Sequence, residues 1–268
     1  MTTPTELLAL YDAQQRLIVP AHPPTGVSFH LLDGVLRVTG RTEGFIETAN
    51  TLDLSGAELD ALIATHRDYF AARGEAVEWK TRAHDRPADI PQRLEHAGFI
   101  AQECETVLVG HSADMLAARP LPSGVQIRET RDRADFAAIA VMLEEVWGEN
   151  FDWMIDELDT QITSDPDLTT VFVAEADGRV VSGARIEFTP GSDFAGLWGG
   201  STLPAWQGNG IYSAITAARA RLAQQRGVPY LQLDASDASR RILQQRGFVA
   251  LTTTTPYRWA PPPTPSAS

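Results

Sequence analysis

The chain is poor in cysteine and lysine, and these shortages narrow its possible functions. Its one cysteine, Cys104, cannot form an internal disulfide, and its place in QECETVLVG, a segment typical of a strand, predicts a buried apolar role. Lysine is almost absent, and 22 basic against 35 acidic residues give a formal net charge of −13. This argues against a nucleic-acid partner, whose phosphates require clusters of Lys and Arg. The charge suits a cationic or amine substrate, although solubility is the simpler explanation.

Long apolar runs are also missing. No stretch approaches the roughly 20 apolar residues of a membrane helix, and MTTPTELLALYDAQQR has no basic segment leading into an apolar run. We therefore expect a cytoplasmic protein with no membrane partner. At 268 residues and 43% apolar content, the chain has the composition of a globular protein and the length for two domains. The histidines show no metal-ligand spacing, so we expect no metal site: His66, His84, His96 and His111.

The C-terminal half has the clearer periodicity. A strand is predicted over 123–130, followed by an amphipathic helix capped by Thr130. Turn residues at Asp177-Gly178 and Pro190-Gly191 divide 169–203 into an antiparallel meander of three strands. A helix ending at Gly227, a strand, a short helix ending at Gly247 and a closing strand complete the pattern.

The N-terminal half repeats part of this order. Ser55 and Glu58 predict a capping box, and the helix that they begin ends at Gly74. A strand, a short helix and Gly98-Phe99 follow, as Gly247-Phe248 follows in the second half. The pattern predicts an internal duplication, although this order of elements is common enough to arise by coincidence. We expect domains at 1–115 and 116–260, with a disordered tail at 261–268.

Two glycines precede the long C-terminal-half helix in TLPAWQGNGIYSAITAAR. The first amides of a helix have no partner within it, and the helix dipole adds positive charge there, so the position binds anions. Gly208 and Gly210 would let a phosphate approach these amides. The alternative is a glycine turn without a ligand. A dinucleotide fingerprint is weak because Ser213 takes its third glycine position, and a P-loop is excluded because its lysine is missing.

LPAWQGNGIY resembles the acetyl-CoA signature of the GNAT superfamily of N-acetyltransferases, with Tyr212 where the family has a small residue. DASDASRRILQQRGF is similar to the family's second signature, and the resemblance covers 124–259. It implies an α+β (mixed α/β) fold of two GNAT-like domains, each a mixed, mostly antiparallel sheet flanked by helices. The N-terminal domain would be degenerate. Asp53 and Glu58 cap its helix where the diphosphate would lie and would repel it, so we expect one acetyl-CoA site per chain.

The resemblance also implies the cofactor contacts. The backbone of 201–203 would hold the oxyanion and the pantetheine arm. The expected cofactor-binding residues are Thr202, Leu203, Gln207, Gly208, Asn209, Gly210, Ile211, Tyr212 and Ser236.

The sequence indicates the general base and the general acid of the expected reaction less clearly. Some family members have a glutamate on the strand before the loop, where this chain has 196–200 without a carboxylate. Glu187, Asp193 and Asp234 are the remaining bases for an amine that starts protonated. Tyr212 or Tyr257 could donate the proton to the thiolate, because Leu243 takes the family's tyrosine position. A solvated surface, a helix cap or core packing explains each of these residues equally well.

We therefore expect an acetyl-CoA-dependent N-acetyltransferase acting on the primary amine of a small molecule, with Glu187, Asp234 and Tyr257 as the catalytic candidates. A non-catalytic acyl-CoA-binding or sensing module is the main alternative, and a pure interaction protein is the third. The N-terminal half could shape the pocket, mediate a homodimer or stabilise the fold. Acidic residues near the expected acceptor site would suit a cation, or form a solvated face: Glu144, Glu145, Asp152 and Asp156. Some of four tryptophans should wall that site, most being core residues: Trp147, Trp153, Trp198 and Trp206.

Overall fold

A computed structural model describes residues 3–262 and divides them into two compact units. Unit 1 comprises the chain up to Val107, Asp234–Ala238 and the residues from Leu251 onward. Unit 2 comprises Leu108–Leu233 and Ser239–Ala250. Most of the last strand therefore belongs to the first unit, whereas the sequence led us to expect two domains that follow one another along the chain. Of the predicted tail, residues 263–268 lie outside the described residues.

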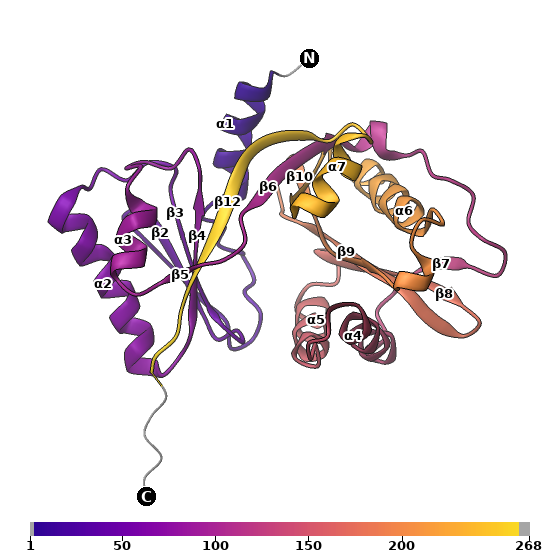
Figure 1. Cartoon of the computed structure of the whole chain (residues 1–268), viewed down its shortest axis with the longest axis horizontal. Helices are drawn as coiled ribbons and strands as arrows, with labels where there is room; N and C mark the ends of the chain where they lie inside the picture. Colours follow the sequence, from indigo (N-terminus) through magenta and orange to yellow (C-terminus); the bar gives the residue numbers. More distant parts are fainter. Residues whose placement is uncertain (1–2, 263–268) are drawn as a thin grey trace, which may run out of the picture. The chain divides into compact units, whose positions relative to one another are not determined.

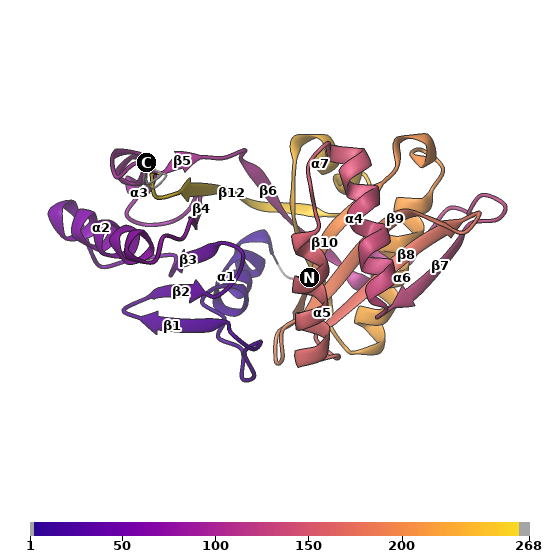
Figure 2. The same ribbon diagram turned by 90° about the horizontal axis from the view of Figure 1, so that it is seen from below.

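Unit 1 is built on a mixed sheet whose first strands are visible side by side in Figure 2. The strand order is β1 (Ser28–Leu32), β2 (Val35–Thr39), β3 (Gly44–Thr48), β4 (Val77–Arg82) and β12 (Val249–Trp259), and the short β5 (Ile100–Ala101) pairs with β12. Neighbours are antiparallel except β3 and β4, which are parallel. Residues alternate between the faces of a strand, so Ile46 and Trp79 face one side of the sheet while Glu47 and Lys80 face the other.

The two faces of this sheet have different chemistry. Helices α2 (Gly56–Arg73) and α3 (Ile90–His96) cover the apolar face, where Leu59, Ile63 and Phe70 join Ile46 and Trp79 in one buried cluster. Helix α1 (Pro4–Gln15) contacts the charged face, because both Nε and Nη2 of Arg82 donate to the Tyr11 hydroxyl. Unit 1 therefore has an apolar core on one side of the sheet and a buried polar layer on the other.

The helix caps of unit 1 differ from the prediction. Ser55 is the N-cap of α2, but its side chain makes no cap hydrogen bond, so the predicted Ser55/Glu58 box is wrong. A capping box instead starts α1, where Thr3 Oγ1 accepts from the Glu6 amide and Glu6 accepts from the Thr3 amide. Asp53 and Glu58 are exposed beside the α2 N-terminus and do not cap it.

Unit 2 contains the predicted meander. Its strands run in the order β11 (Tyr230–Ala235), β10 (Phe194–Thr202), β9 (Arg179–Phe188), β8 (Thr169–Ala176) and β7 (Gln126–Thr130). Only β10 and β11 are parallel among these neighbours. Helices α4 (Arg133–Trp147) and α5 (Trp153–Ser164) lie on one face of this sheet and α6 (Ile211–Gln225) on the other (Figure 1). This is the expected α+β architecture, a mostly antiparallel sheet flanked by helices.

Four further elements complete the chain: β6 (Glu105–His111), the 3-10 helices η1 (Ser112–Met115) and η2 (Pro204–Trp206), and α7 (Asp237–Gln244). Two local predictions need correction. Asp132, not Thr130, caps α4, because its carboxylate accepts from the Ala134 amide. Cys104 is exposed rather than buried, since the expected strand breaks into β5 and β6 around it. Within residues 3–262, no helix is long and apolar enough to cross a bilayer.

The predicted repeat is present as an order of elements. In unit 1, β3, α2 and β4 form a parallel strand pair joined by a helix, and β10, α6 and β11 do the same in unit 2. A short helix and a Gly-Phe pair follow in both cases, α3 with Gly98-Phe99 and α7 with Gly247-Phe248. The two βαβ segments can therefore be compared directly.

One buried histidine makes the stability of unit 1 depend on pH. His66 lies on the buried face of α2 with its ring 5.8 Å from that of Trp79, and its Nδ1 has no hydrogen-bond partner. Burial, followed by the charges of Arg37 and His30, lowers the pKa of His66 from 6.5 to about 4. The folded state therefore keeps this ring neutral where the unfolded state protonates it.

We expect the contribution of His66 to stability to be complete above pH 6.5 and to be lost as the pH falls to about 4. At one pKa unit per about 1.4 kcal/mol, the loss is on the order of 3 kcal/mol. Urea unfolding between pH 7 and pH 4 measures it, with His66→Leu as the variant that removes this slope. An unchanged slope in His66→Leu would show that other groups cause the dependence.

Candidate active site

The site begins at a break in β10. Pairing with β9 runs to Trp198–Arg185, then the register shifts and resumes at Ser201–Gly183. Gly199 has a φ of +62°, and a Cβ at Gly200 would lie 3.0 Å from Cε2 of Tyr212. Glycine is therefore required at this bulge for its backbone conformation and for the Tyr212 ring. The bulge leaves Gly199 and Gly200 exposed at the strand edge.

The predicted glycine loop follows directly. Gly208 and Gly210 have φ values of +76° and +82°, and Gly210 is the N-cap of α6 without a side-chain cap. The first helical bond joins the Ala214 amide to the Gly210 carbonyl, so the amides of 211–213 precede the helical hydrogen-bond ladder. Nothing lies within 4 Å of the position that a Cβ at Gly208 would take. These amides and the helix dipole form a site suited to a phosphate.

Several predicted cofactor residues instead support the loop. Gln207 Nε2 donates to the Thr202 carbonyl at 3.0 Å, and Asn209 Nδ2 donates to the Gln207 carbonyl at 3.2 Å. The Leu203 amide donates to the Val181 carbonyl at 3.0 Å. Of the backbone groups expected at 201–203, the Leu203 amide is thus engaged within the protein.

The parallel strands of unit 2 separate beside this loop. The register between β10 and β11 covers only Phe194–Tyr230, Ala195–Leu231 and Gly196–Gln232. Along β10 the chain then reaches the bulge, the strand end and the glycine loop. The backbone edge of β10 is consequently available to an extended ligand that ends at the α6 N-terminus.

The corresponding strands of unit 1 remain joined. Beyond the β3–β4 register, Thr51 and Arg86 form a further parallel bridge, in which the Arg86 amide donates to Asn50 and the Leu52 amide to Arg86, each at 2.8 Å. Arg16 Nη1 also donates to the Thr48 carbonyl. The edge that is open in unit 2 is therefore closed by hydrogen bonds in unit 1.

Glu187 is the catalytic candidate that lies in the same unit as the glycine loop. It stands on β9, about one third exposed, and accepts from Arg185 Nε at 2.6 Å. A Cβ at Gly199 would lie 3.0 Å from Nη1 of Arg185, so the Arg185–Glu187 pair borders the bulge. This arrangement puts the Arg185 guanidinium next to Gly199 and pairs the Glu187 carboxylate with that guanidinium. Asp193, at the β9–β10 turn, makes contacts of its own.

Asp234 and Tyr257 lie in unit 1. Asp234 forms an ion pair with Lys80 on the charged face of that sheet. Tyr257 belongs to the apolar cluster and faces Trp79 across β4 and β12, and its burial raises the pKa of its hydroxyl. Ser236, in the same unit, precedes α7.

The tryptophans and acidic residues near the α4–α5 turn are more exposed than expected. Trp147 and Trp153 are 63% and 46% exposed, and Trp147 Nε1 donates to Ser201 Oγ at 3.2 Å, next to the bulge. Two of the acidic residues are neutralised, Glu145 by Arg179 and Asp156 by Arg133. Aromatic surface rather than free negative charge thus borders the β10 end on this side.

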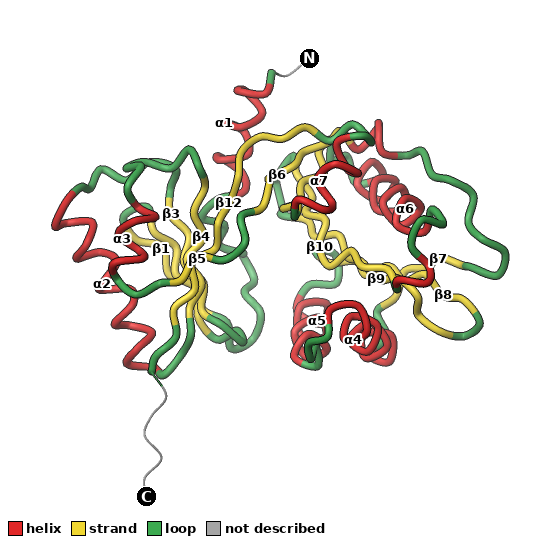
Figure 3. The backbone as a smooth tube through the Cα atoms, viewed as in Figure 1, coloured by secondary structure: helices red, strands yellow, loops and turns green. Residues whose placement is uncertain are grey.

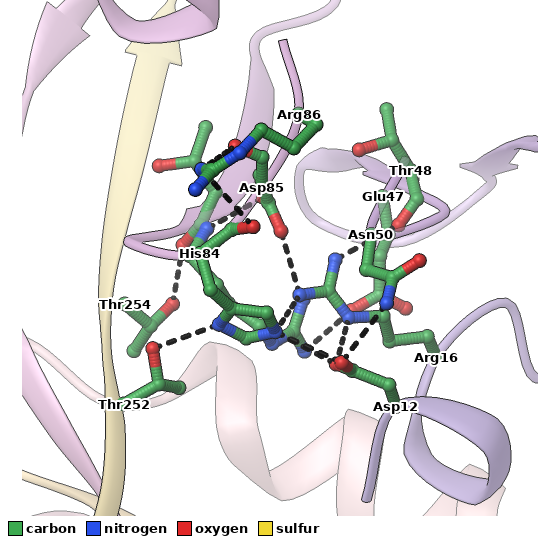
Figure 4. Close-up of polar contacts among 12 residues, drawn as sticks. Asp12, Arg16, Glu47, Thr48, Asn50, His84, Asp85, Arg86, Thr252 and Thr254 are labelled. Carbon is green, nitrogen blue, oxygen red and sulfur yellow. Dashed lines mark hydrogen bonds and ion pairs between the residues drawn. The ribbon is translucent and has the colours of Figure 1, made fainter. Parts of the chain in front are cut away.

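Unit 1 contains a cluster of polar side chains that form hydrogen bonds and ion pairs with one another. Figure 4 shows Arg16, Asp12, His84 and Asp85 pointing toward one another between α1 and the end of β4. Arg16 donates to Asp12 and Asp85, each at 2.7 Å, and His84 Nε2 lies 2.9 Å from Asp12 Oδ2. The members satisfy one another, so the cluster offers little to a ligand. Over the described residues, no group of three or more His, Cys, Asp or Glu has the arrangement of a metal site.

Comparison with known proteins gives a family match for part of the chain. Residues 134–248 match the model of the acetyltransferase (GNAT) family, while a comparison with curated proteins found no match. A GCN5-related N-acetyltransferase from Kribbella flavida has a TM-score of 0.69 at 16% identity, covering 100% of this chain and 98% of its own. One from Sphaerobacter thermophilus gives 0.63 at 17% identity, over 87% and 82%. A tandem GNAT protein from the clavulanic acid biosynthesis pathway gives 0.62 at 12%, over 90% and 86%.

The family match over residues 134–248 supports an acyltransferase. The chain carries a GNAT acetyltransferase domain over residues 134–248, the class that transfers acetyl groups from acyl-CoA. This interval contains the bulge, the glycine loop and Glu187. Sequence reasoning missed the approach of Arg185 to Gly199, and it missed Trp147 as a partner of Ser201, because both contacts join different elements of the chain.

Proposed function

We propose that unit 2 transfers the acetyl group of acetyl-CoA to the primary amine of a small molecule. The observation that carries the proposal is the loop at Gly208–Gly210, where two left-handed glycines present the first amides of α6 beside the bulged edge of β10. The GNAT match over 134–248 supports the same reaction class.

The residues present fit the cofactor. The open space at Gly208 admits a phosphate, and the amides of 208–212 would bind the diphosphate. The edge of β10 would bind the pantetheine arm through its backbone, between the bulge and Thr202. When bound, acetyl-CoA supplies an acetyl group activated as a thioester. The amides of Gly199 and Gly200 would stabilise the negative charge that develops on the carbonyl oxygen.

Glu187 would take the proton from the ammonium form of the acceptor. It borders the bulge through Arg185, and the exposed indoles of Trp147 and Trp153 would flank the acceptor. An amine must lose its proton to attack, so a carboxylate within reach of the acetyl group is the required base. Positioning and backbone electrostatics would supply the rest of the rate enhancement.

We expect Glu187→Gln to lower kcat by about 10²-fold or more and leave the Kd for acetyl-CoA unchanged, because a general base contributes on this scale. Raising the pH should restore part of the activity, since the free amine then forms without a base. Glu175→Gln is the matched control. Glu175, on β8, forms an ion pair with Arg128 of β7 and has no proposed catalytic role. Equal kcat values for the two variants would remove Glu187 from the mechanism.

Release of free CoA thiol on mixing the protein with acetyl-CoA and a panel of small primary amines tests the proposed reaction. Amine-dependent thiol release supports it. The ion pairing of Glu187 with Arg185 favours the second candidate, a module that binds acyl-CoA without turnover. Binding of acetyl-CoA by calorimetry without thiol release on any amine would support that module and contradict the transferase.

A further inference from the structure

The N-terminus of α6 is overlaid by a segment from outside the glycine signature. The loop between η1 and β7, residues 116–125, is the long green trace that follows η1 in Figure 3. A Cβ at Gly210 would lie 3.0 Å from Cβ and 3.8 Å from Cδ of Arg119, and 3.7 Å from the Pro120 carbonyl oxygen. Arg119 therefore packs directly on the N-cap of α6.

A second arginine reaches the same loop from another part of unit 2. Arg246, in the turn after α7, donates from Nη2 to the Ala117 carbonyl at 3.0 Å. Its Nε is buried and has no hydrogen-bond partner. Burial lowers the pKa of Arg246, Tyr212 opposes this shift, and the charge of Arg119 adds to it. Arg246 thus lies within electrostatic reach of both Arg119 and Tyr212 near the first turn of α6.

A third arginine lies within α6 itself. Arg219 is 1% exposed, its Nη1 donates to the Arg185 carbonyl of β9 at 3.2 Å, its Nη2 lies 3.4 Å from Thr216 Oγ1, and its Nε has no partner. Burial lowers the pKa of Arg219, and hydrogen bonding with Tyr212 opposes the shift. This buried positive charge lies on the Tyr212 side of α6.

These three arginines have no carboxylate partner in the part of the chain that the structure describes, although the chain as a whole is acidic. Ten other arginines form ion pairs, but among residues 3–262 none of Arg119, Arg219 and Arg246 does. Like charges that lie close together in a partly buried place repel one another, and a bound anion relieves this repulsion. A guanidinium binds phosphate oxygens with high geometric specificity.

We propose that Arg119 and Arg246 bind the phosphates of the nucleotide half of acetyl-CoA and determine its affinity. Arg219, buried between the middle of α6 and β9, adds to the positive potential near these two arginines. The inference rests on the proposed cofactor site and extends it to two residues that the signature does not contain. The segment 116–125 is then part of the cofactor site rather than a linker.

Calorimetry on the full chain tests this with Arg119→Gln and Arg246→Gln. Arg221→Gln is the control, because Arg221 is exposed on α6 and its substitution removes the same charge about three turns from the loop. We expect each test variant to weaken acetyl-CoA binding tenfold or more and the control to change it less than twofold. Thermal unfolding identifies loss of fold, and Arg119 is exposed, so its variant should keep the wild-type stability.

Acetyl 3′-dephospho-CoA distinguishes the two phosphate sources. A variant effect that disappears with this ligand assigns the arginine to the 3′-phosphate, and one that persists assigns it to the diphosphate. Either result supports the inference. Affinities of both test variants equal to that of Arg221→Gln would overturn it while leaving the transferase intact. Failure of the unsubstituted chain to bind acetyl-CoA would overturn the proposed function and this inference together.

Discussion

We expect Gly210→Val to bind acetyl-CoA at least about 100-fold more weakly than the unsubstituted protein. Gly210 has a φ of +82°, which costs a β-branched residue more than about 1–2 kcal/mol. Its new Cβ would also lie 3.0 Å from Cβ of Arg119, so the 116–125 segment or the N-cap must move. Moving the N-cap misdirects the amides of 211–213, and charge-assisted hydrogen bonds of this kind contribute about 1.5–3 kcal/mol each.

The matched control for this prediction is Gly178→Val. Gly178 has a φ of +74° in the β8–β9 turn, and nothing lies within 4 Å of its Cβ position. The Gly178→Val substitution introduces similar backbone strain at a position outside the loop. The Kd of this variant for acetyl-CoA should therefore stay within twofold of that of the unsubstituted protein. Calorimetry measures both. Wild-type affinity in Gly210→Val would remove the α6 N-terminus from the cofactor site.

Arg16→Met should destabilise unit 1 by about 3–5 kcal/mol, because it leaves buried carboxylates without their partner. The Arg16 side chain is 2% exposed, and it holds Asp12, Asp85 and the Thr48 carbonyl together (Figure 4). These contacts join α1 to the ends of β3 and β4. We therefore expect increased amide hydrogen exchange in α1 and around 48–52, while the meander of unit 2 keeps its protection.

Arg133→Met provides the comparison for an exposed ion pair. Arg133 is 53% exposed and pairs with Asp156 and Asp159 on the surface of unit 2. Such pairs contribute about 0–1 kcal/mol. Urea unfolding followed by hydrogen exchange measures both variants. Equal losses of stability would show that the cluster in unit 1 is no more than a set of solvated ion pairs.

The fold was predictable where the pattern is local. The turns at Asp177-Gly178 and Pro190-Gly191, the α6 periodicity and the Gly-Phe repeat each depend on neighbouring residues, and the structure has them in the predicted order. The return of residues 251–259 to unit 1 was not predictable, because strand pairing between distant segments leaves no mark in either one. For the same reason, Tyr257 could not be placed in the core of unit 1 from its sequence position.

The candidate site was likewise predictable only where it depends on neighbouring residues in the sequence. The conformations at Gly208 and Gly210 follow from residue type, so the loop could be located from the sequence. Gln207 and Asn209 match the signature, yet their side chains bind the loop's own carbonyls. Arg119, Arg219 and Arg246 come from a loop, a helix interior and a turn, and nothing in the sequence relates them. A buried arginine such as Arg219 also interrupts an otherwise apolar helix face, where periodicity alone predicts an apolar residue.

The central claim is that the amides of 208–212 bind the diphosphate of acetyl-CoA and that the corresponding turn of unit 1 does not. Amide chemical shifts of the 15N-labelled protein, recorded during titration with acetyl-CoA, measure this residue by residue. We predict large shifts for Gly208, Gly210, Ile211 and Tyr212, and none for Gly56–Leu59 at the start of α2. Shifts confined to the start of α2, or a glycine loop unmoved at saturation, would contradict the account.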